Sequence, residues 1–374
     1  MSPLRLRPIA FLIVSLLVVS CSNQTTNNRA FVFDKITDTI YQASGTGREV
    51  VGANSAIIIN EDDALLVDSH MTPLAARRLL QELTTLTTKR VRYVVNTHFH
   101  FDHTDGNQVF GPYTDIIASA FTRQTLQEKG METESFKRFT GGLPATIDTL
   151  KKQIAVEQDQ ARKQMLADSL GKTERFYRSL QDIKVTLPNL VLEKSLILYK
   201  GDREIQILHL GRAHTAGDVV VFLPKEKVLC TGDMLTEGLP YVGDGYLYQW
   251  VRTLEGLKKL DAETIIPGHG HVLQGKEKID QLQSYLRDLL RQVEAFVERG
   301  ATLDETVAGV NLSSHQPDYP SLAQGTPRLH VERAYEEAKL RVQLRAAAKA
   351  KGAKAQAGAE EEEGAAPEGT EKQK

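Results

Sequence analysis

The sequence predicts an α/β protein in which β-sheets are covered by helices, and two observations support this prediction. Short β-type runs form two groups, within residues 31–118 and 190–266, and helical segments join the runs in each group. A stretch with helical periodicity, 130–185, separates the two groups. Groups of strands interspersed with helices in this way are typical of sheets whose faces are covered by helices.

The composition fits a globular protein that acts on a small molecule. The chain has 374 residues, of which 41% are hydrophobic and 25% are charged, so it can bury a sizeable core. The formal net charge is −2. A nucleic-acid-binding protein would carry a basic surface. We therefore expect a small-molecule substrate and no nucleic-acid partner.

Residues 1–20 have the character of a secretion signal. Two arginines precede an apolar run over 9–19, which is too short to span a bilayer. The run ends in Val18-Val19-Ser20-Cys21, which resembles the bacterial lipobox. That resemblance implies cleavage before Cys21, acylation of the new N-terminus, and a membrane anchor followed by a polar tether over 21–30. The alternative is an ordinary signal that is cleaved elsewhere.

The two cysteines bear on the expected location of the protein and on whether it has a disulfide. We expect the protein in the periplasm or at the cell surface, and Ser22 after Cys21 favours the outer membrane where the cell has one. Cys230 is the only other cysteine in the sequence, so no structural disulfide is expected. It lies in an apolar strand and is interpreted as a small buried hydrophobic residue.

The first half of the chain predicts a mixed sheet. Strands are predicted at 31–33, 40–42, 55–59, 64–67, 90–96 and 114–118. Thr72 and Pro73 begin a helix before the fifth strand, because threonine caps a helix and proline fits its first turn. Another helix is predicted around 120–128. This order describes a sheet covered by helices.

Residues 130–185 are predicted to form a helical insertion between the two halves. Apolar residues recur at helical spacing along one face, at Ile147, Leu150, Ile154, Ala161 and Met165. A second helix is predicted at 172–180, with breaks or hinges at Gly141, Gly142 and Gly171. A lid over the functional site and extra core packing are both consistent with this pattern.

The second half repeats the first in outline and completes a domain over 31–345. Two hairpins are predicted, 190–198 with 204–210 and 218–222 with 227–230. A helix at 249–260, a strand at 264–266 and a long amphipathic helix at 276–298 follow. From 346 to 374 the sequence offers no apolar side chain larger than alanine, which predicts a disordered tail.

Four potential metal ligands follow the strand at 90–96, namely His98, His100, Asp102 and His103. Continued alternation of the strand would put the first three on one side. His103 breaks that alternation, so a bend at 102–103 would deliver two histidines to one cation and an Asp–His pair to a neighbouring cation. Imidazole with carboxylate suits zinc or iron.

Three more candidate ligands lie at strand ends beside glycine. They are His214 in the loop before a strand, Asp233 in Thr-Gly-Asp-Met and His269 in Pro-Gly-His-Gly. Glycine lets the backbone turn sharply and approach a crowded centre. Each residue alone is consistent with an ordinary loop, but the set together indicates a metal site.

These motifs together resemble the metallo-β-lactamase superfamily over about residues 31–300. The matching stretches are His98-x-His100-x-Asp102-His103, Ala-His214-Thr, Thr-Gly-Asp233 and Pro-Gly-His269-Gly, and Asn54, Asp68 and Trp250 also match. The resemblance implies a four-layer αββα sandwich with the site along one edge of the sheets. The motifs are highly specific for the superfamily and poorly specific for substrate.

The resemblance also implies roles for the ligands and two zinc ions, with iron as the alternative metal. His98, His100 and His214 would hold the first metal, Asp102, His103 and His269 the second, and Asp233 would bridge them. Many lactamases have cysteine or an uncharged residue at this last position, whereas glyoxalase II-like and general hydrolases have aspartate. Asp233 therefore disfavours β-lactam hydrolysis and favours two metals.

The implied reaction is hydrolysis by a hydroxide that the two metals share. Asp102 and Asp233 are the candidate catalytic residues, and Asp102 would orient the hydroxide and accept its proton. Asp68, Asp218 and Thr215 are candidates to hold the ligating imidazoles in place. The loop 236–249 is a candidate wall of the substrate cleft through Tyr241, Tyr246 and Tyr248, with packing at the rim as the alternative. His70, His209 and His271 are expected to be structural.

We therefore expect an exported, lipid-anchored zinc hydrolase that acts on an ester, thioester, lactone or lactam. One alternative is an iron-dependent persulfide dioxygenase, whose family uses a similar motif set. Another alternative is a metal-binding lipoprotein without enzymatic activity.

Overall fold

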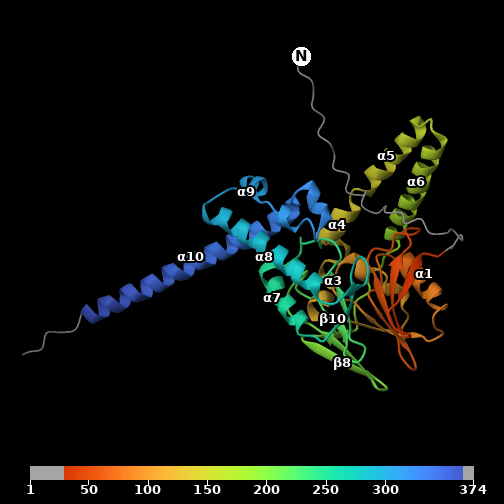
Figure 1. Cartoon of the computed structure of the whole chain (residues 1–374), viewed down its shortest axis with the longest axis horizontal. Helices are drawn as coiled ribbons and strands as arrows, with labels where there is room; N and C mark the ends of the chain where they lie inside the picture. Colours follow the sequence, from red (N-terminus) through yellow and green to blue (C-terminus); the bar gives the residue numbers. More distant parts are fainter. Residues whose placement is uncertain (1–28, 365–374) are drawn as a thin grey trace, which may run out of the picture.

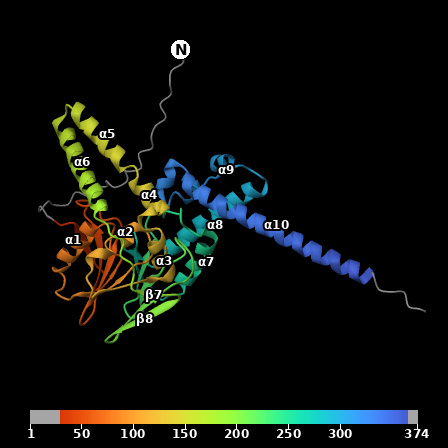
Figure 2. The same ribbon diagram turned by 180° about the vertical axis from the view of Figure 1, so that it is seen from behind.

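Two β-sheets lie face to face, and helices cover the outer face of each sheet. The computed structural model describes residues 29–364, with side chains through residue 348. Helix α1 (Pro73–Leu83) lies outside the first sheet, and α7 (Leu247–Lys258) and α8 (Glu277–Glu298) lie outside the second (Figures 1 and 2). The expected four-layer αββα sandwich is confirmed. The expected signal peptide and Cys21 lie outside the described residues.

The first sheet contains seven strands in chain order. They are β1 (Phe31–Lys35), β2 (Ile40–Gly45), β3 (Ser55–Ile59), β4 (Ala64–Val67), β5 (Val91–Val95), β6 (Asp115–Ser119) and β7 (Leu190–Leu192). β1 to β4 pair antiparallel and β4 to β7 pair parallel. α1 makes the crossover from β4 to β5, and Thr72 caps it by accepting a hydrogen bond from the Ala75 N–H (3.1 Å), as predicted. α3 (Ala120–Glu128) follows β6.

The second sheet contains six strands. They are β8 (Ser195–Lys200), β9 (Arg203–Leu208), β10 (Val220–Leu223), β11 (Val228–Gly232), β12 (Thr264–Pro267) and β13 (Leu273–Gln274). Only the β11–β12 pair is parallel, and α7 lies in that crossover. The prediction of a single strand over 190–198 is wrong, because this segment forms two strands, β7 and β8. The chain leaves the first sheet after Leu192 and enters the second at Ser195, because the exposed polar pair Glu193–Lys194 breaks the strand.

The space between the sheets is filled by branched aliphatic side chains from both inner faces. Ile58 and Val95 of the first sheet and Val221 of the second are fully buried there. Cys230 lies among them at 1% exposure, as predicted. Burial raises the pKa of its thiol, so the sulfur is neutral and acts as a small hydrophobic group.

Strand direction places the functional loops together. β5, β11 and β12 each run parallel to a neighbouring strand, and their carboxyl ends lead directly into the segments that carry His98, Asp233 and His269. The carboxyl ends of parallel strands are the usual position for ligand-binding loops in α/β sheets. The fold therefore explains why ligands far apart in the sequence converge.

The insertion forms three helices, α4 (Glu134–Thr140), α5 (Leu143–Val156) and α6 (Gln160–Gln181), of which α5 and α6 project from the body as a hairpin (Figure 1). Two predictions here are wrong. Gly171 lies inside α6 and does not break it. The predicted apolar face spans the turn between α5 and α6, so Ile147 is buried near the base whereas Met165 is 66% exposed.

The C-terminal segment contains short helices and one long helix. α9 (Leu303–Gly309) and two 3₁₀ turns (Ser313–His315 and Pro320–Gln324) precede α10 (Arg328–Gly364), which extends beyond the body (Figure 1). Within the stretch expected to form a disordered tail, α10 continues from 346 to Gly364, and residues 365–374 lie outside the described residues. Alanine, lysine and glutamate are strong helix formers, so this composition supports a helix without providing a core. No helix within residues 29–364 is both long and apolar enough to cross a membrane.

A buried histidine connects α10 to the functional half of the molecule. Nδ1 of His330 accepts a hydrogen bond from the Tyr285 hydroxyl of α8 (2.8 Å), and the Pro240 carbonyl accepts one from the ring. Burial lowers the pKa of His330 to about 4, although the Pro240 carbonyl acts in the opposite direction. The neutral imidazole thus fixes the start of the loop that carries Tyr241.

This burial predicts a pH dependence of stability. Between pH 6.5 and 4 the unfolded chain protonates His330 and the folded protein does not. We expect the contribution of His330 to the free energy of unfolding to fall by about 2 kcal/mol between pH 7.5 and 5. His330→Gln should remove that part of the slope in urea denaturation, and His271→Gln, which removes an exposed imidazole, should not. A wild-type slope in the His330 variant would contradict the assignment.

Candidate metal centre

The loop after β5 is shaped by one buried carboxylate. Asp68 accepts hydrogen bonds from the Thr97 backbone N–H at Oδ1 (2.7 Å) and from the Thr97 hydroxyl at Oδ2 (2.9 Å). The strand ends at Val95, and the one-turn helix α2 (Phe101–Thr104) follows. The expected bend is therefore present, and it begins just after His100.

The seven predicted ligands form two groups of converging donor atoms. One group consists of His98, His100, His214 and Asp233, and the other of Asp102, His103 and His269. Within each group the donor atoms lie within 4.8 Å of one another. The groups correspond to the two metal sites that the family resemblance implied. Strand alternation alone would have put Asp102 with His98 and His100, and the turn of α2 moves it to the second group.

Asp233 lies between the two groups. Its Oδ2 is 3.4 Å from Nε2 of His214 in the first group. Its Oδ1 is 3.4 Å from Nε2 of His103 and 3.3 Å from Nε2 of His269 in the second group. Each carboxylate oxygen therefore faces a different group, which is the arrangement that a bridging ligand requires.

The donor atoms fit metal ions better than they fit one another. Nε2 of His98, Nε2 of His103 and Oδ1 of Asp233 are buried without a hydrogen-bond partner among the described residues. Buried polar atoms without partners are rare and costly. Imidazole nitrogens and carboxylate oxygens are the ligands that zinc prefers. The chemistry of the donor set thus fits two zinc ions.

Protonation differs between the two groups. Burial lowers the pKa of His214 to about 3, and burial together with neighbouring histidines lowers that of His98 well below its usual value. Burial has the same effect on His269, but Asp233 and Asp102 outweigh it and raise the pKa to about 10. His98 and His214 of the first group are therefore neutral, and a metal in the second group would displace a proton from His269.

Hydrogen bonds orient three of the ligating rings. Nδ1 of His103 is 2.7 Å from Asp68 Oδ2, and Nδ1 of His98 is 3.0 Å from the Thr97 hydroxyl. Nε2 of His100 is 2.9 Å from Asp244 Oδ2. Each ring thus has one nitrogen held and the other directed into its donor group.

Asp68 holds a ligating imidazole, as predicted. The prediction and the structure differ for Asp218 and Asp244. Asp218 accepts hydrogen bonds from the N–H and hydroxyl of Thr215 (2.8 and 2.7 Å), so it shapes the loop after His214. Asp244 was missed. The only signal in the sequence was its position between Gly243 and Gly245.

The loops after β5, β11 and β12 meet where their backbones approach one another closely. A Cβ on Gly232 would lie 2.4 Å from the Thr97 hydroxyl, and one on Gly268 would lie 2.0 Å from Asp233 Oδ1. Only glycine fits at either position. Asn54 fastens the same junction, since its side-chain amide donates to the carbonyls of Pro267 (3.0 Å) and Gly270 (2.8 Å).

The remaining predicted histidines are structural, as expected. His70 is buried, with Nδ1 3.0 Å from the Ala53 carbonyl. Nδ1 of His209 is 2.8 Å from the Asp218 carbonyl. His271 is exposed and pairs with Glu237 at 2.9 Å. None of the three belongs to a donor group.

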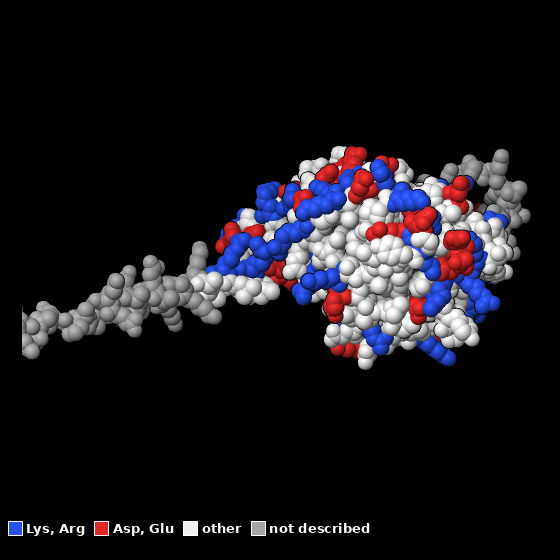
Figure 3. All heavy atoms as spheres, turned by 90° about the horizontal axis from the view of Figure 1, so that it is seen from below, with Lys and Arg blue, Asp and Glu red and all other residues white. Residues whose placement is uncertain are grey.

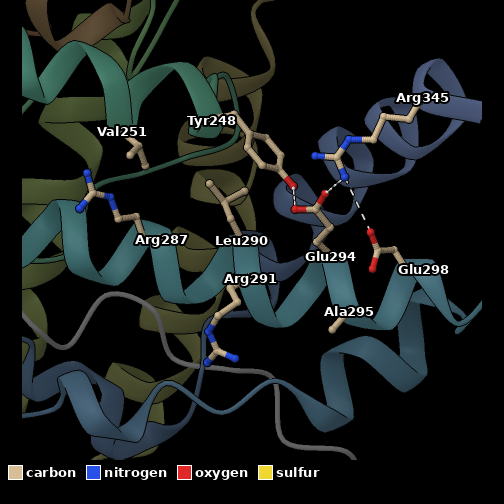
Figure 4. A pocket seen from close by; sticks show the side chains of 9 residues that line it. All are labelled: Tyr248, Val251, Arg287, Leu290, Arg291, Glu294, Ala295, Glu298 and Arg345. Carbon is tan, nitrogen blue, oxygen red and sulfur yellow. Dashed lines mark hydrogen bonds and ion pairs between the residues drawn. The ribbon is translucent and has the colours of Figure 1, made fainter. Parts of the chain in front are cut away.

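Of the three tyrosines proposed for the cleft, only Tyr241 contacts the ligands. Its ring centroid lies 5.6 Å from that of His100 and 6.2 Å from that of His214. Tyr246 precedes α7 and packs under Arg212. Tyr248 lines a separate groove of about 590 Å³, bounded by residues of α7, α8 and α10, where it donates a hydrogen bond to Glu294 (Figure 4). Tyr248 therefore does not line the cleft beside the ligands.

Comparison with known proteins identifies the family. Residues 48–269 match the model described as the metallo-beta-lactamase superfamily. The chain belongs to this superfamily. A linear primary-alkylsulfatase from Pseudomonas sp. (strain ATCC 19151) is 26% identical over 289 residues, 73% of this chain and 53% of the relative. A metallo-beta-lactamase type 2 from Bacillus cereus is 22% identical over 230 residues, 60% of this chain and 69% of the relative.

A solved structure supports the fold of the superfamily. The metallo-beta-lactamase from Pontibacter korlensis superposes with a TM-score of 0.50 at 17% identity, covering 69% of this chain and 99% of that protein. Because the chain spans only 53% of the alkylsulfatase, the activity of that protein does not transfer as a whole.

Because Asp68 holds the ring of His103, we expect a substitution of Asp68 to weaken zinc binding. Asp68→Asn keeps the side-chain size and tolerates the positive φ of 66°, but it removes the charge beside His103. We expect a loss of zinc affinity of about 10- to 100-fold, measured by competition with a chelating dye. Asp34→Asn, on the exposed side of β1, is the control. Unchanged affinity in the Asp68 variant would show that His103 does not depend on this carboxylate.

Proposed function

We propose that this superfamily member is a binuclear zinc hydrolase. The observation that supports the proposal most strongly is the position of Asp233, whose two oxygens face the two donor groups separately. Members of the superfamily typically bind zinc, and the two groups of histidine and aspartate suit it. One carboxylate shared by both groups would hold the two ions close enough to act on one substrate bond.

The residues of the chain define how such a centre would work. Two zinc ions, when bound, would supply an activated water at neutral pH and stabilise negative charge that develops on the substrate. His98, His100 and His214 would hold the first ion together with one oxygen of the shared Asp233. Asp102, whose Oδ2 lies 3.2 Å from His269 Nε2, would orient the water and accept its proton.

The proposed substrates carry a bond that water cleaves at an electrophilic centre. We include carboxylic and sulfate esters, thioesters, lactones and lactams. The relatives support this range, because one is named a linear primary-alkylsulfatase and another a metallo-beta-lactamase. Asp233 favours the ester-type bonds over β-lactams, for the reason given by the family resemblance.

We further propose that the enzyme is exported and anchored to a membrane by lipid on Cys21. The support comes from the sequence, in which an apolar run of signal-peptide length ends at a lipobox-like Val-Val-Ser-Cys. On the face shown in Figure 3, acidic and basic side chains lie side by side over the body.

The proposal predicts turnover that depends on the first donor group. Zinc-loaded protein should hydrolyse at least one member of a panel of chromogenic esters, sulfate esters, thioesters, lactones and cephalosporins. His100→Ala should lower kcat/KM by at least about 100-fold, because even the partners that orient ligands contribute 10- to 100-fold. Circular dichroism should show a retained fold.

The exposed His271 provides the matched control for this test, and His271→Ala should keep the activity. Absence of turnover across the panel with two zinc ions bound would contradict the proposal. Iron in protein purified without added metal, together with sulfur-dependent oxygen uptake, would favour a persulfide dioxygenase instead.

The bridging position of Asp233 predicts metal stoichiometry. Asp233→Ala should bind about one zinc ion per chain where the wild type binds two, because the second group loses the carboxylate that it shares. Metal analysis after gel filtration measures this ratio, with Asp34→Ala as control. Full occupancy by two zinc ions in the Asp233 variant would contradict the bridging role.

A further inference from the structure

A continuous line of aromatic rings leads from the ligands to the molecular surface. The Tyr241 ring lies 5.6 Å from that of His100, and the Phe139 ring lies 5.7 Å from that of Tyr241. Phe101, in α2 between two ligands, lies 6.0 Å from Phe139. The rings come from separate parts of the chain: α2, the insertion helix α4 and the loop after β11.

Phe139 leaves much of its ring uncovered in this arrangement. Its exposed fraction is 51%, whereas that of Phe101 is 7%. The outer part of the line is therefore a partly exposed aromatic surface beside the metal centre, and the charged side chains of Arg138, Glu134 and Asp244 lie near its Tyr241 end.

The rest of the insertion fixes Phe139 in place. Phe136, one turn earlier in α4, lies 5.5 Å from Phe101 and packs with Leu143 and Leu180 at the base of the insertion. The Thr133 hydroxyl caps α4 by accepting a hydrogen bond from the Phe136 N–H (3.3 Å). Phe139 is thus presented by a packed helix. Helix α4 thus packs beside the site through its aromatic residues.

We propose that Phe139 and Tyr241 bind the apolar portion of the substrate, so that the preferred substrates carry an alkyl or aryl chain next to the bond that is cleaved. The inference rests on the proposed hydrolase function and names its substrate class. A small molecule is the occupant because the surface is continuous with the ligand His100. Two rings are far too small for a stable protein interface, which buries about 800 Å² per partner.

The inference is tested by binding, which does not require turnover. Butyrate and octanoate are titrated into the zinc-loaded protein by calorimetry, because both carry the same carboxylate and differ by four methylenes. Each fully buried methylene contributes about 0.8 kcal/mol, close to fourfold in affinity. We expect octanoate to bind at least about tenfold more tightly than butyrate to the wild type, since the partly open surface buries only part of the chain.

Substitutions of Phe139 test whether its ring binds the alkyl chain. Phe139→Ala should reduce the octanoate preference to about threefold or less, and Phe139→Leu should keep an intermediate preference. Half-exposed Phe139 can be replaced without disturbing the core. Met165→Ala is the matched control, because Met165 is 66% exposed on α6, whose N-terminal end lies toward the tip of the projecting hairpin (Figure 1). It should keep the wild-type preference.

The outcomes separate this inference from the proposed function. An equal preference in wild type and Phe139→Ala, or no preference in the wild type, would overturn the apolar site whether or not esters are hydrolysed. A preference that depends on Phe139 in a protein that hydrolyses no member of the panel would overturn the hydrolase proposal and keep the apolar site.

Discussion

The structure depends on one carboxylate that two groups of donors share. Asp233 stands at the end of β11, and each of its oxygens faces a different group of imidazoles at 3.3 to 3.4 Å. A buried carboxylate is costly unless it is compensated. Here the compensation comes from His269 and His103 of the second group, which hold the pKa of Asp233 well below its usual range against the effect of burial. Bound metal ions would compensate the negative charge of Asp233 in the same way.

The surrounding fold serves to bring that carboxylate and its partners together. Parallel pairs in both sheets direct the ends of β5, β11 and β12 to one edge, and glycines at 232 and 268 let the loops meet at distances no side chain would permit. A layer of orienting residues, Asp68, Asp244 and Thr97, then fixes the rings. The insertion adds aromatic residues beside this edge without altering the sandwich.

Sequence reasoning predicted all seven converging donors, because the ligands lie in short motifs at strand ends, and it predicted most of the strands but not β13 or the break between β7 and β8. It failed where position depends on tertiary structure. Asp244 is 144 residues from His100, and only folding brings them together. Tyr246 and Tyr248 appeared equivalent to Tyr241, but α7 begins at Leu247 and carries Tyr248 away toward α8.

In the proposed centre, two metal ions lie on either side of Asp233. Anomalous diffraction at the zinc absorption edge from crystals of the zinc-loaded protein tests it most directly. Two peaks should appear about 3.5–4 Å apart, one beside His98, His100 and His214, and the other beside Asp102, His103 and His269. A single peak, or a pair that does not flank Asp233, would contradict the account.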